Sequence, residues 1–201
     1  MLPVYPESPS TPELVAEISA MNREFLGLLT HPLVVGYPQL LGLDSGVISS
    51  LRRLNDNQLK SLAQAPLLLA DFELLRGAGG GSGRQAFCVA ENSVPGEWQD
   101  CVLNYANRLL TSLWHYSRQP DGITGFCVGL DQRTAGPLAA MNFSELCDRA
   151  DAICASLHAR HAEHPVCWPD LVSSARCEQP EKLSAAQLRL IPLTVAENFS
   201  T

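Results

Sequence analysis

The sequence predicts an all-α fold: a tandem, pseudo-symmetric helical repeat with a glycine-rich linker and an irregular C-terminal tail. Apolar residues recur at steps of three and four along several segments, which is the spacing of one helix face. A second set of such segments repeats the first set 87 positions further along the chain, beyond a run of glycines. We expect a first helical unit at 1–76, a linker and loop at 77–100, a second unit at 101–172 and a tail at 173–201.

In the first unit, Ser10 and Glu13 form a candidate capping box at the start of a helix that should end near Thr30, because Pro32 disfavours helical geometry before it. Asp44 is a candidate N-cap for a second helix and Asp56 for a third. The apolar run 67–75 fits either a fourth helix or a short strand, since periodicity does not separate the two.

The second unit repeats this plan. At the offset of 87 positions, the segment 41–44 matches 128–131. At an offset of 85, the pair Asn22-Arg23 matches Asn107-Arg108. Asn142 with Glu145 forms a capping box for a longer helix, whose apolar face is expected to continue as far as Leu157. Two units are too few for a solenoid, so we expect them to pack face to face as an intramolecular pair, a pseudo-dimer within one chain.

Composition limits the partners. The chain has 201 residues and a net charge of -7, with 14 Lys and Arg residues, too few for an extended nucleic-acid surface. No stretch of about eighteen residues is apolar throughout, so no contact with a membrane is expected. The N-terminus lacks the basic and apolar regions of a secretory signal, and we expect a cytoplasmic protein whose seven cysteines are reduced.

The repeated framework resembles the FlhD family of bacterial flagellar transcriptional activators, over residues 11–75 and 104–161. In the first unit the resemblance is carried by Glu13-Leu14, Ile18, Asn22, Leu26, Leu41-Gly42-Leu43, Leu51, Leu54, Gln58-Leu59, Leu62-Ala63 and Phe72. In the second unit it is carried by the segments 126–131 and 138–142 with Glu145-Leu146 and Ala150.

That resemblance implies a small helical protein in which a tandem duplication stands in for the family's dimer. Members of the family work with a zinc-binding partner subunit, FlhC, so it also implies a protein partner. The family's DNA-proximal segment follows the position of Phe72, where this chain has the glycine run 77–83. We therefore expect contact with DNA only through a partner.

The sharpest candidate for a metal site is the cluster of His158, His161, His164 and Cys167, which could supply the four ligands of a tetrahedral zinc ion. His158 and His161 lie close together if this segment is helical. The alternative is structural: His161 and His164 continue the apolar face of Leu157, and histidines suit the negative end of a helix dipole. We favour the structural interpretation and expect no metal and no cofactor.

The segment 47–63 has the helix-turn-helix outline of a DNA-binding motif, and Arg52, Arg53 and Lys60 are the candidate DNA contacts. These few cations are poor for anchoring phosphates. Cys147 and Cys154 lie on or beside an apolar helix face and are expected to pack in the core rather than act as nucleophiles.

From these observations we expect a non-catalytic helical regulatory or adaptor protein, acting through protein–protein contacts in bacterial gene regulation or surface-organelle assembly. Two alternatives stay open. One is a sequence-specific DNA-binding regulator, and the other is a metal- or thiol-dependent enzyme that uses the cluster from His158 to Cys167.

Overall fold

The computed structural model describes residues 11–37, 39–76, 95–119, 122–177 and 179–199. Helices dominate these ranges, which confirms the all-α class at the level of secondary structure. The helices are α1 (Thr11–Thr30), α2 (Ser45–Leu51), α3 (Asp56–Ala63), α4 (Gly96–Ser117), α5 (Gly122–Val128), α6 (Gln132–Ala140), α7 (Phe143–Cys154), α8 (Cys167–Arg176), α9 (Pro180–Leu188) and α10 (Leu190–Phe199). Short antiparallel strands accompany them, β1 (Gln39–Leu40) with β2 (Leu43–Asp44), and β3 (Ala70–Phe72) with β4 (Leu157–Ala159).

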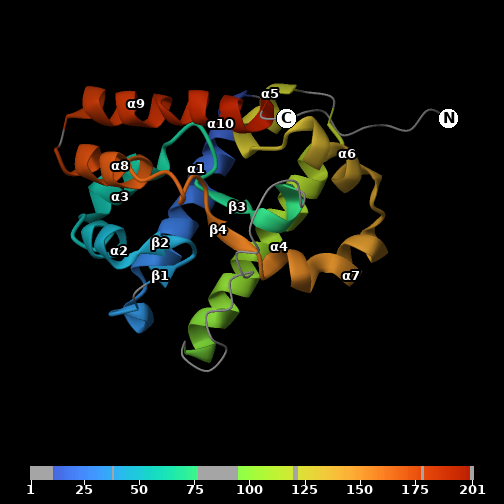
Figure 1. Ribbon diagram of the computed structural model, residues 1–201, viewed down its shortest axis with the longest axis horizontal. Coiled ribbons are helices and arrows are strands. Elements are labelled where there is room, and N and C mark those ends of the chain that lie inside the picture. The colour runs from blue at the N-terminus through green and yellow to red at the C-terminus, as the bar shows by residue number, and fades with distance from the viewer. Residues whose placement is uncertain (1–10, 38, 77–94, 120–121, 178, 200–201) are drawn as a thin grey trace.

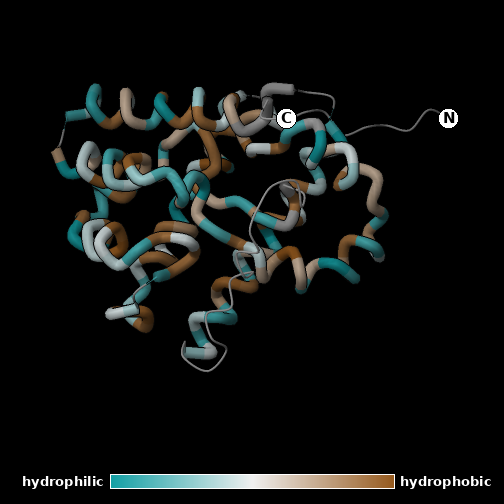
Figure 2. Tube along the Cα trace, viewed as in Figure 1, coloured by the Kyte–Doolittle hydropathy of each residue, from teal (hydrophilic) through white to brown (hydrophobic). Residues whose placement is uncertain are grey.

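Two groups of helices flank a central layer (Figure 1). The long helices α1 and α4 and the β3–β4 pair lie in the centre. Helices α2, α3 and α8 pack together on one side, and α6 and α7 pack against α4 on the other. Hydrophobic and hydrophilic residues alternate along the helices, as amphipathic packing requires (Figure 2). None of the helices in the described ranges is long and apolar enough to cross a bilayer.

Helix starts follow the predicted caps at Asp44 and Asn142, and the predicted cap at Ser10 lies outside the described residues. Asp44 caps α2 by accepting hydrogen bonds from the backbone N–H groups of Gly46 and Val47, and the capping box of Asn142 and Glu145 starts α7. The prediction of Asp56 as the cap of α3 is wrong by one residue. The cap is Asn55, because Gln58 lies three residues after it and completes a capping box.

The central β3–β4 pair corrects one prediction and decides an open one. Helix α7 ends at Cys154 and does not continue to Leu157, which instead lies in β4 opposite Phe72 of β3. The run 67–75 therefore contains a strand, followed by a short 3-10 turn at Glu73–Arg76. Pairing between distant segments supplies backbone hydrogen bonds and so overrides the helical spacing of the apolar residues.

The C-terminal region is another correction, because 173–201 is not an irregular tail. Helix α8 runs through the expected boundary at 172, and α9 and α10 follow it. Buried apolar residues are spaced at helical intervals along α8, α9 and the start of α10: Leu171, Val172, Ala175, Leu183, Ala186 and Leu190. Helix α4 begins at Gly96, within the segment 77–100 that was expected to be linker and loop. The predicted linker at 77–94 lies outside the described residues.

Helices α1 and α4 pack antiparallel. The Trp98 indole N–H donates to the Leu28 carbonyl at one end, Arg108 binds the Glu24 carboxylate in the middle, and Tyr116 hydrogen-bonds Glu17 at the other end. Desolvation raises the pKa of the Tyr116 hydroxyl above its usual value, and its bond to the Glu17 carboxylate adds to this rise.

Candidate functional site

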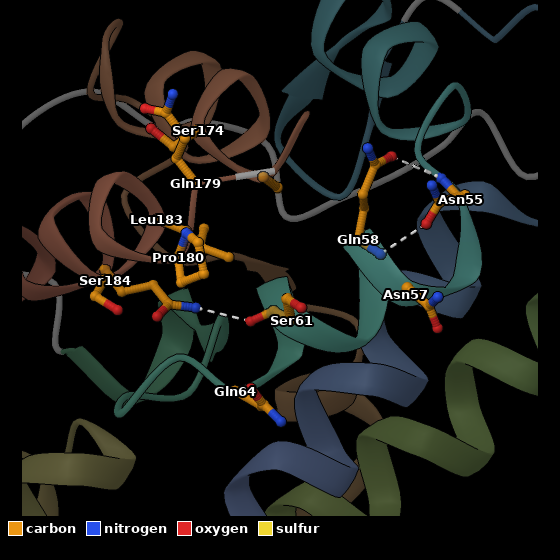
Figure 3. A pocket seen from close by; sticks show the side chains of 12 residues that line it. Asn55, Asn57, Gln58, Ser61, Gln64, Ser174, Gln179, Pro180, Leu183 and Ser184 are labelled. Atoms are coloured by element: carbon orange, nitrogen blue, oxygen red, sulfur yellow. Dashed lines mark hydrogen bonds between the residues drawn. The ribbon is translucent and has the colours of Figure 1, made fainter. Parts of the chain in front are cut away.

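A cleft of about 440 Å³ separates α3 from the hairpin formed by α8 and α9 (Figure 3). Its volume lies within the range of small-ligand and peptide sites. The lining residues are Asn55, Asn57, Gln58, Ser61, Gln64, Ser174, Ala175, Gln179, Pro180, Leu183, Ser184 and Gln187. Six of these side chains are carboxamides and three are hydroxyls.

The helices position these side chains from both sides. The capping box orients Asn55 and Gln58 at the start of α3, each accepting a backbone N–H bond from the other residue at 2.9 Å. Gln187 of α9 is buried and donates from Nε2 to the Ser61 carbonyl at 3.0 Å, which ties α9 to α3 (Figure 3). Leu183 supplies a buried apolar surface beside this contact.

Among the described residues that line the cleft, none has an acidic, basic, histidine or cysteine side chain. General acid–base catalysis needs a titratable group within hydrogen-bond reach, and an activated serine needs a base beside it. Phosphate recognition needs cations. The described residues of the cleft therefore offer carboxamides and hydroxyls as their hydrogen-bonding groups.

The structure does not bring the predicted metal ligands together. His158 lies in strand β4, so the helix on which His158 and His161 would lie close together is not formed at this segment. His161 follows the strand with a φ of 56° and is buried, with Nε2 3.2 Å from the Thr194 hydroxyl of α10. Cys167 is buried at the start of α8. Among the described residues, no three His, Cys, Asp or Glu side chains are grouped to hold a metal ion.

His161 is a structural tether in this arrangement. The Thr194 hydroxyl donates its proton to the Leu190 carbonyl at 3.0 Å, so the hydrogen bond between Thr194 and His161 is donated by Nε2–H. This bond attaches α10 to the turn after β4. His164 is half-buried, and its Nδ1 has no hydrogen-bond partner among the described residues.

The candidate DNA contacts are only partly available. Arg52 is half-buried and donates from Nη2 to the His31 carbonyl at 3.1 Å, so it stabilises the turn after α1. Arg53 at the end of α2 and Lys60 on α3 are exposed. Two exposed cations on a chain with a net charge of -7 are weak anchors for a phosphate backbone.

Cys147 and Cys154, which were both expected to pack in the core, differ in their exposure. Cys154 is buried as expected, and burial, together with the nearby Asp151 charge, raises the pKa of its thiol to about 11. A thiol with this pKa stays protonated at neutral pH and is a poor nucleophile. Cys147 is exposed, which corrects the prediction of core packing, because α7 turns this residue away from α4.

Sequence reasoning did not identify the carboxamide-lined cleft. The sequence does indicate one wall of the cleft, because α3 and its flanks carry four carboxamides within ten residues: Asn55, Asn57, Gln58 and Gln64. The opposite wall comes from 174–187, more than a hundred residues away, in a region expected to be irregular. In comparisons with known proteins, no family model, curated protein or solved structure matches the chain.

Proposed function

We propose that the chain is a non-catalytic adaptor or regulatory protein, built as an FlhD-like tandem pseudo-dimer and acting through protein–protein contacts. Bacterial gene regulation or surface-organelle assembly is the setting that the family resemblance implies. Any contact with DNA is made through a partner.

One observation supports this proposal above the others. In two antiparallel contacts, a residue lies opposite the residue that matches it in the repeat, or opposite that residue's immediate neighbour. Asp71 of β3 pairs with His158 of β4, its counterpart at the offset of 87. On α4, Arg108 binds Glu24 of α1, the immediate neighbour of its own counterpart Arg23. An isologous two-fold contact places each residue opposite its own equivalent in this way.

Local geometry gives the pseudo-dimer further support. Gly42 and Gly129, which match at the same offset, have φ values of 88° and 77°, a region that disfavours residues with a side chain. The residues Asp44 and Asp131 cap the helices that follow. The capping boxes of α3 and α7 also begin at matching asparagines, Asn55 and Asn142.

The carboxamide and hydroxyl character of the described cleft residues, together with the protonated thiol of Cys154, favours binding over catalysis. A metal-dependent activity has no support from the positions of His158, His161 and Cys167 described above.

A mobility-shift titration of the purified full-length protein against genomic DNA fragments tests the proposal. The protein alone should bind no better than a non-specific binder, with Kd of roughly 10⁻⁴ to 10⁻⁶ M at physiological salt. A nanomolar, sequence-selective shift without a partner would overturn the adaptor function and favour Arg53 and Lys60 as recognition residues.

The second part of the test uses the partner itself. Proteins that co-purify from the native host are expressed separately and titrated with the chain by calorimetry. We expect one of them to form a binary complex of fixed stoichiometry, and a chain that forms no such complex contradicts the proposal.

A further inference from the structure

We propose that the cleft between α3 and the α8–α9 hairpin is the docking site for an extended, uncharged polypeptide segment. This inference rests on the proposed function only in that the segment belongs to the protein partner. The cleft itself, its lining and its hydrogen bonds are observed independently of the resemblance.

The lining excludes two classes of ligand. A charged ligand would lose its hydration without gaining a counter-charge, because none of the described lining residues is ionisable. An apolar ligand would bury the carboxamides of Asn55, Gln58 and Gln179 without partners, which is costly. The fitting ligand is neutral and carries donors and acceptors together.

Several donors on the walls are available to such a ligand. The capping box uses the side-chain oxygens of Asn55 and Gln58, and their NH₂ groups make no hydrogen bond within the described residues. The side chains of Asn57, Gln64 and Gln179 are exposed and also make no hydrogen bond within the described residues. The free NH₂ groups of Asn55 and Gln58 can donate to a peptide C=O, and the whole carboxamides of the other three residues can pair with a peptide C=O or N–H.

The chain already uses this chemistry internally. Across the cleft, the Gln187 carboxamide binds the main-chain carbonyls of Ser61 and Leu62, at 3.0 and 3.4 Å. In the core, the Asn22 carboxamide binds main-chain groups of the segment 63–69. A carboxamide presents the same donor and acceptor pair as a peptide group, so the two are complementary.

A carbohydrate is the other neutral ligand of this polarity. Aromatic rings commonly cover the apolar faces of sugars, and no aromatic residue lines the cleft. A peptide needs no such platform, since its backbone supplies a donor and an acceptor at every residue. The geometry therefore favours a peptide, and a sugar is one of the outcomes that the test separates.

The test uses ¹⁵N-labelled full-length protein, because the side-chain NH₂ groups of Asn and Gln give their own NMR signals. The first probe is a pool of uncharged octapeptides, capped at both ends and built from Gly, Ala, Ser, Thr, Asn and Gln. A peptide pool with Asp and Lys at alternate positions, maltotriose and inorganic phosphate are the comparison probes. The NH₂ signals of Asn55, Gln58 and Gln179 should shift with the uncharged pool and not with the other three.

Two variants locate the binding. Ser184→Trp fills the cleft from α9, and Ser144→Trp places the same side chain on the exposed surface of α7 as a control. Asn57→Asp adds a charge without changing size, so it remains informative if the tryptophan disturbs folding. We expect binding of the pool to be lost in S184W, unchanged in S144W and weakened at least about tenfold, equivalent to about 1.4 kcal/mol, in N57D.

Three results would overturn the inference: shifts caused by maltotriose or phosphate instead of peptide, peptide binding that S184W and N57D leave unchanged, or no shift at millimolar pool concentration. The proposed function is tested separately from this inference. A partner complex that forms equally well with S184W rejects the cleft as the docking site and leaves the adaptor function standing.

Discussion

Asn22 and Asn107 occupy matching positions on α1 and α4, yet only Asn22 is buried. Its Nδ2 donates to the carbonyls of Ala63 and Leu67, and its Oδ1 accepts from the N–H of Leu69. One side chain thus satisfies the backbone of the segment that joins α3 to β3. The Asn107 carboxamide instead donates to Leu103 of its own helix.

Asn22→Ala should therefore destabilise the protein by about 3 kcal/mol, because several buried backbone groups lose their partner. Asn107→Ala is the matched control and should cost less than about 0.5 kcal/mol, as exposed substitutions usually do. Urea unfolding followed by circular dichroism measures both. Equal losses for the two variants would contradict the structural role given to Asn22.

The raised pKa of Cys154 predicts an alkaline loss of stability. Its folded value of about 11 lies above the model-peptide value of 9.0, so between these pH values the native state keeps a proton that the unfolded state releases. The thiol's contribution is complete below pH 9 and falls as pH rises toward 11.

Unfolding free energies of the wild type and of Cys154→Ala, measured at intervals from pH 8 to about pH 11, test this linkage. The difference in unfolding free energy between the wild type and Cys154→Ala should decrease as pH rises. A difference that stays constant over this range would disprove the linkage.

At the scale of elements, Asp71 of β3 and Arg160, which directly follows β4, form a buried ion pair. The Asp71 carboxylate lies 3.7 Å from Nε of Arg160, and both side chains are buried. Arg160 also donates from Nη2 to the Val128 carbonyl, and its guanidinium lies against Gly129, where an added Cβ would come within 1.9 Å of it. A glycine at this turn is required both by its φ and by this close approach.

Asp71→Ala should cost about 3 to 5 kcal/mol, because it leaves the Arg160 charge buried without its carboxylate. The exposed pair of Glu24 and Arg108 is the control, and Glu24→Ala should cost no more than about 1 kcal/mol. A double-mutant cycle with Arg160→Met measures the coupling directly. Similar costs for the buried and exposed pairs would refute this account.

The sequence predicted the elements whose signals are local. Asp44 and the Asn142–Glu145 box start helices because a cap acts within three residues. The end of α7 could not be predicted, since the residues after Cys154 are helical by spacing and become a strand only through pairing with β3. The cleft depends on the same kind of distant contact, between α3 and a hairpin that local patterns did not reveal.

For the whole molecule, the contacts imply that neither predicted unit completes its core alone. Strand β3 of the N-terminal half of the chain pairs with β4 of the C-terminal half, and α8 packs on α2 and α3. The buried face of Trp168 on α8 contacts Phe25 of α1, with ring centroids 6.5 Å apart. The two halves of the chain share one hydrophobic core.

Fragments 1–80 and 81–201, co-expressed as separate chains, should therefore associate into a one-to-one complex with a helical content close to that of the intact protein. Each fragment alone should be less helical, because its apolar faces lack their cover. Size-exclusion chromatography with circular dichroism measures both. Fragments that each fold stably and do not associate would show that the units are independent domains.

The pairing of β3 with β4 has a consequence for how the protein is made. Leu157 is synthesised 85 residues after Phe72, which at ribosomal rates takes about 4 to 17 s. During that interval the nascent chain carries an unpaired strand edge and an uncovered helical face on α2 and α3. Neighbouring chains on one polysome can supply the missing strand, so chaperone binding and domain-swapped dimers are the hazards that this topology imposes during translation.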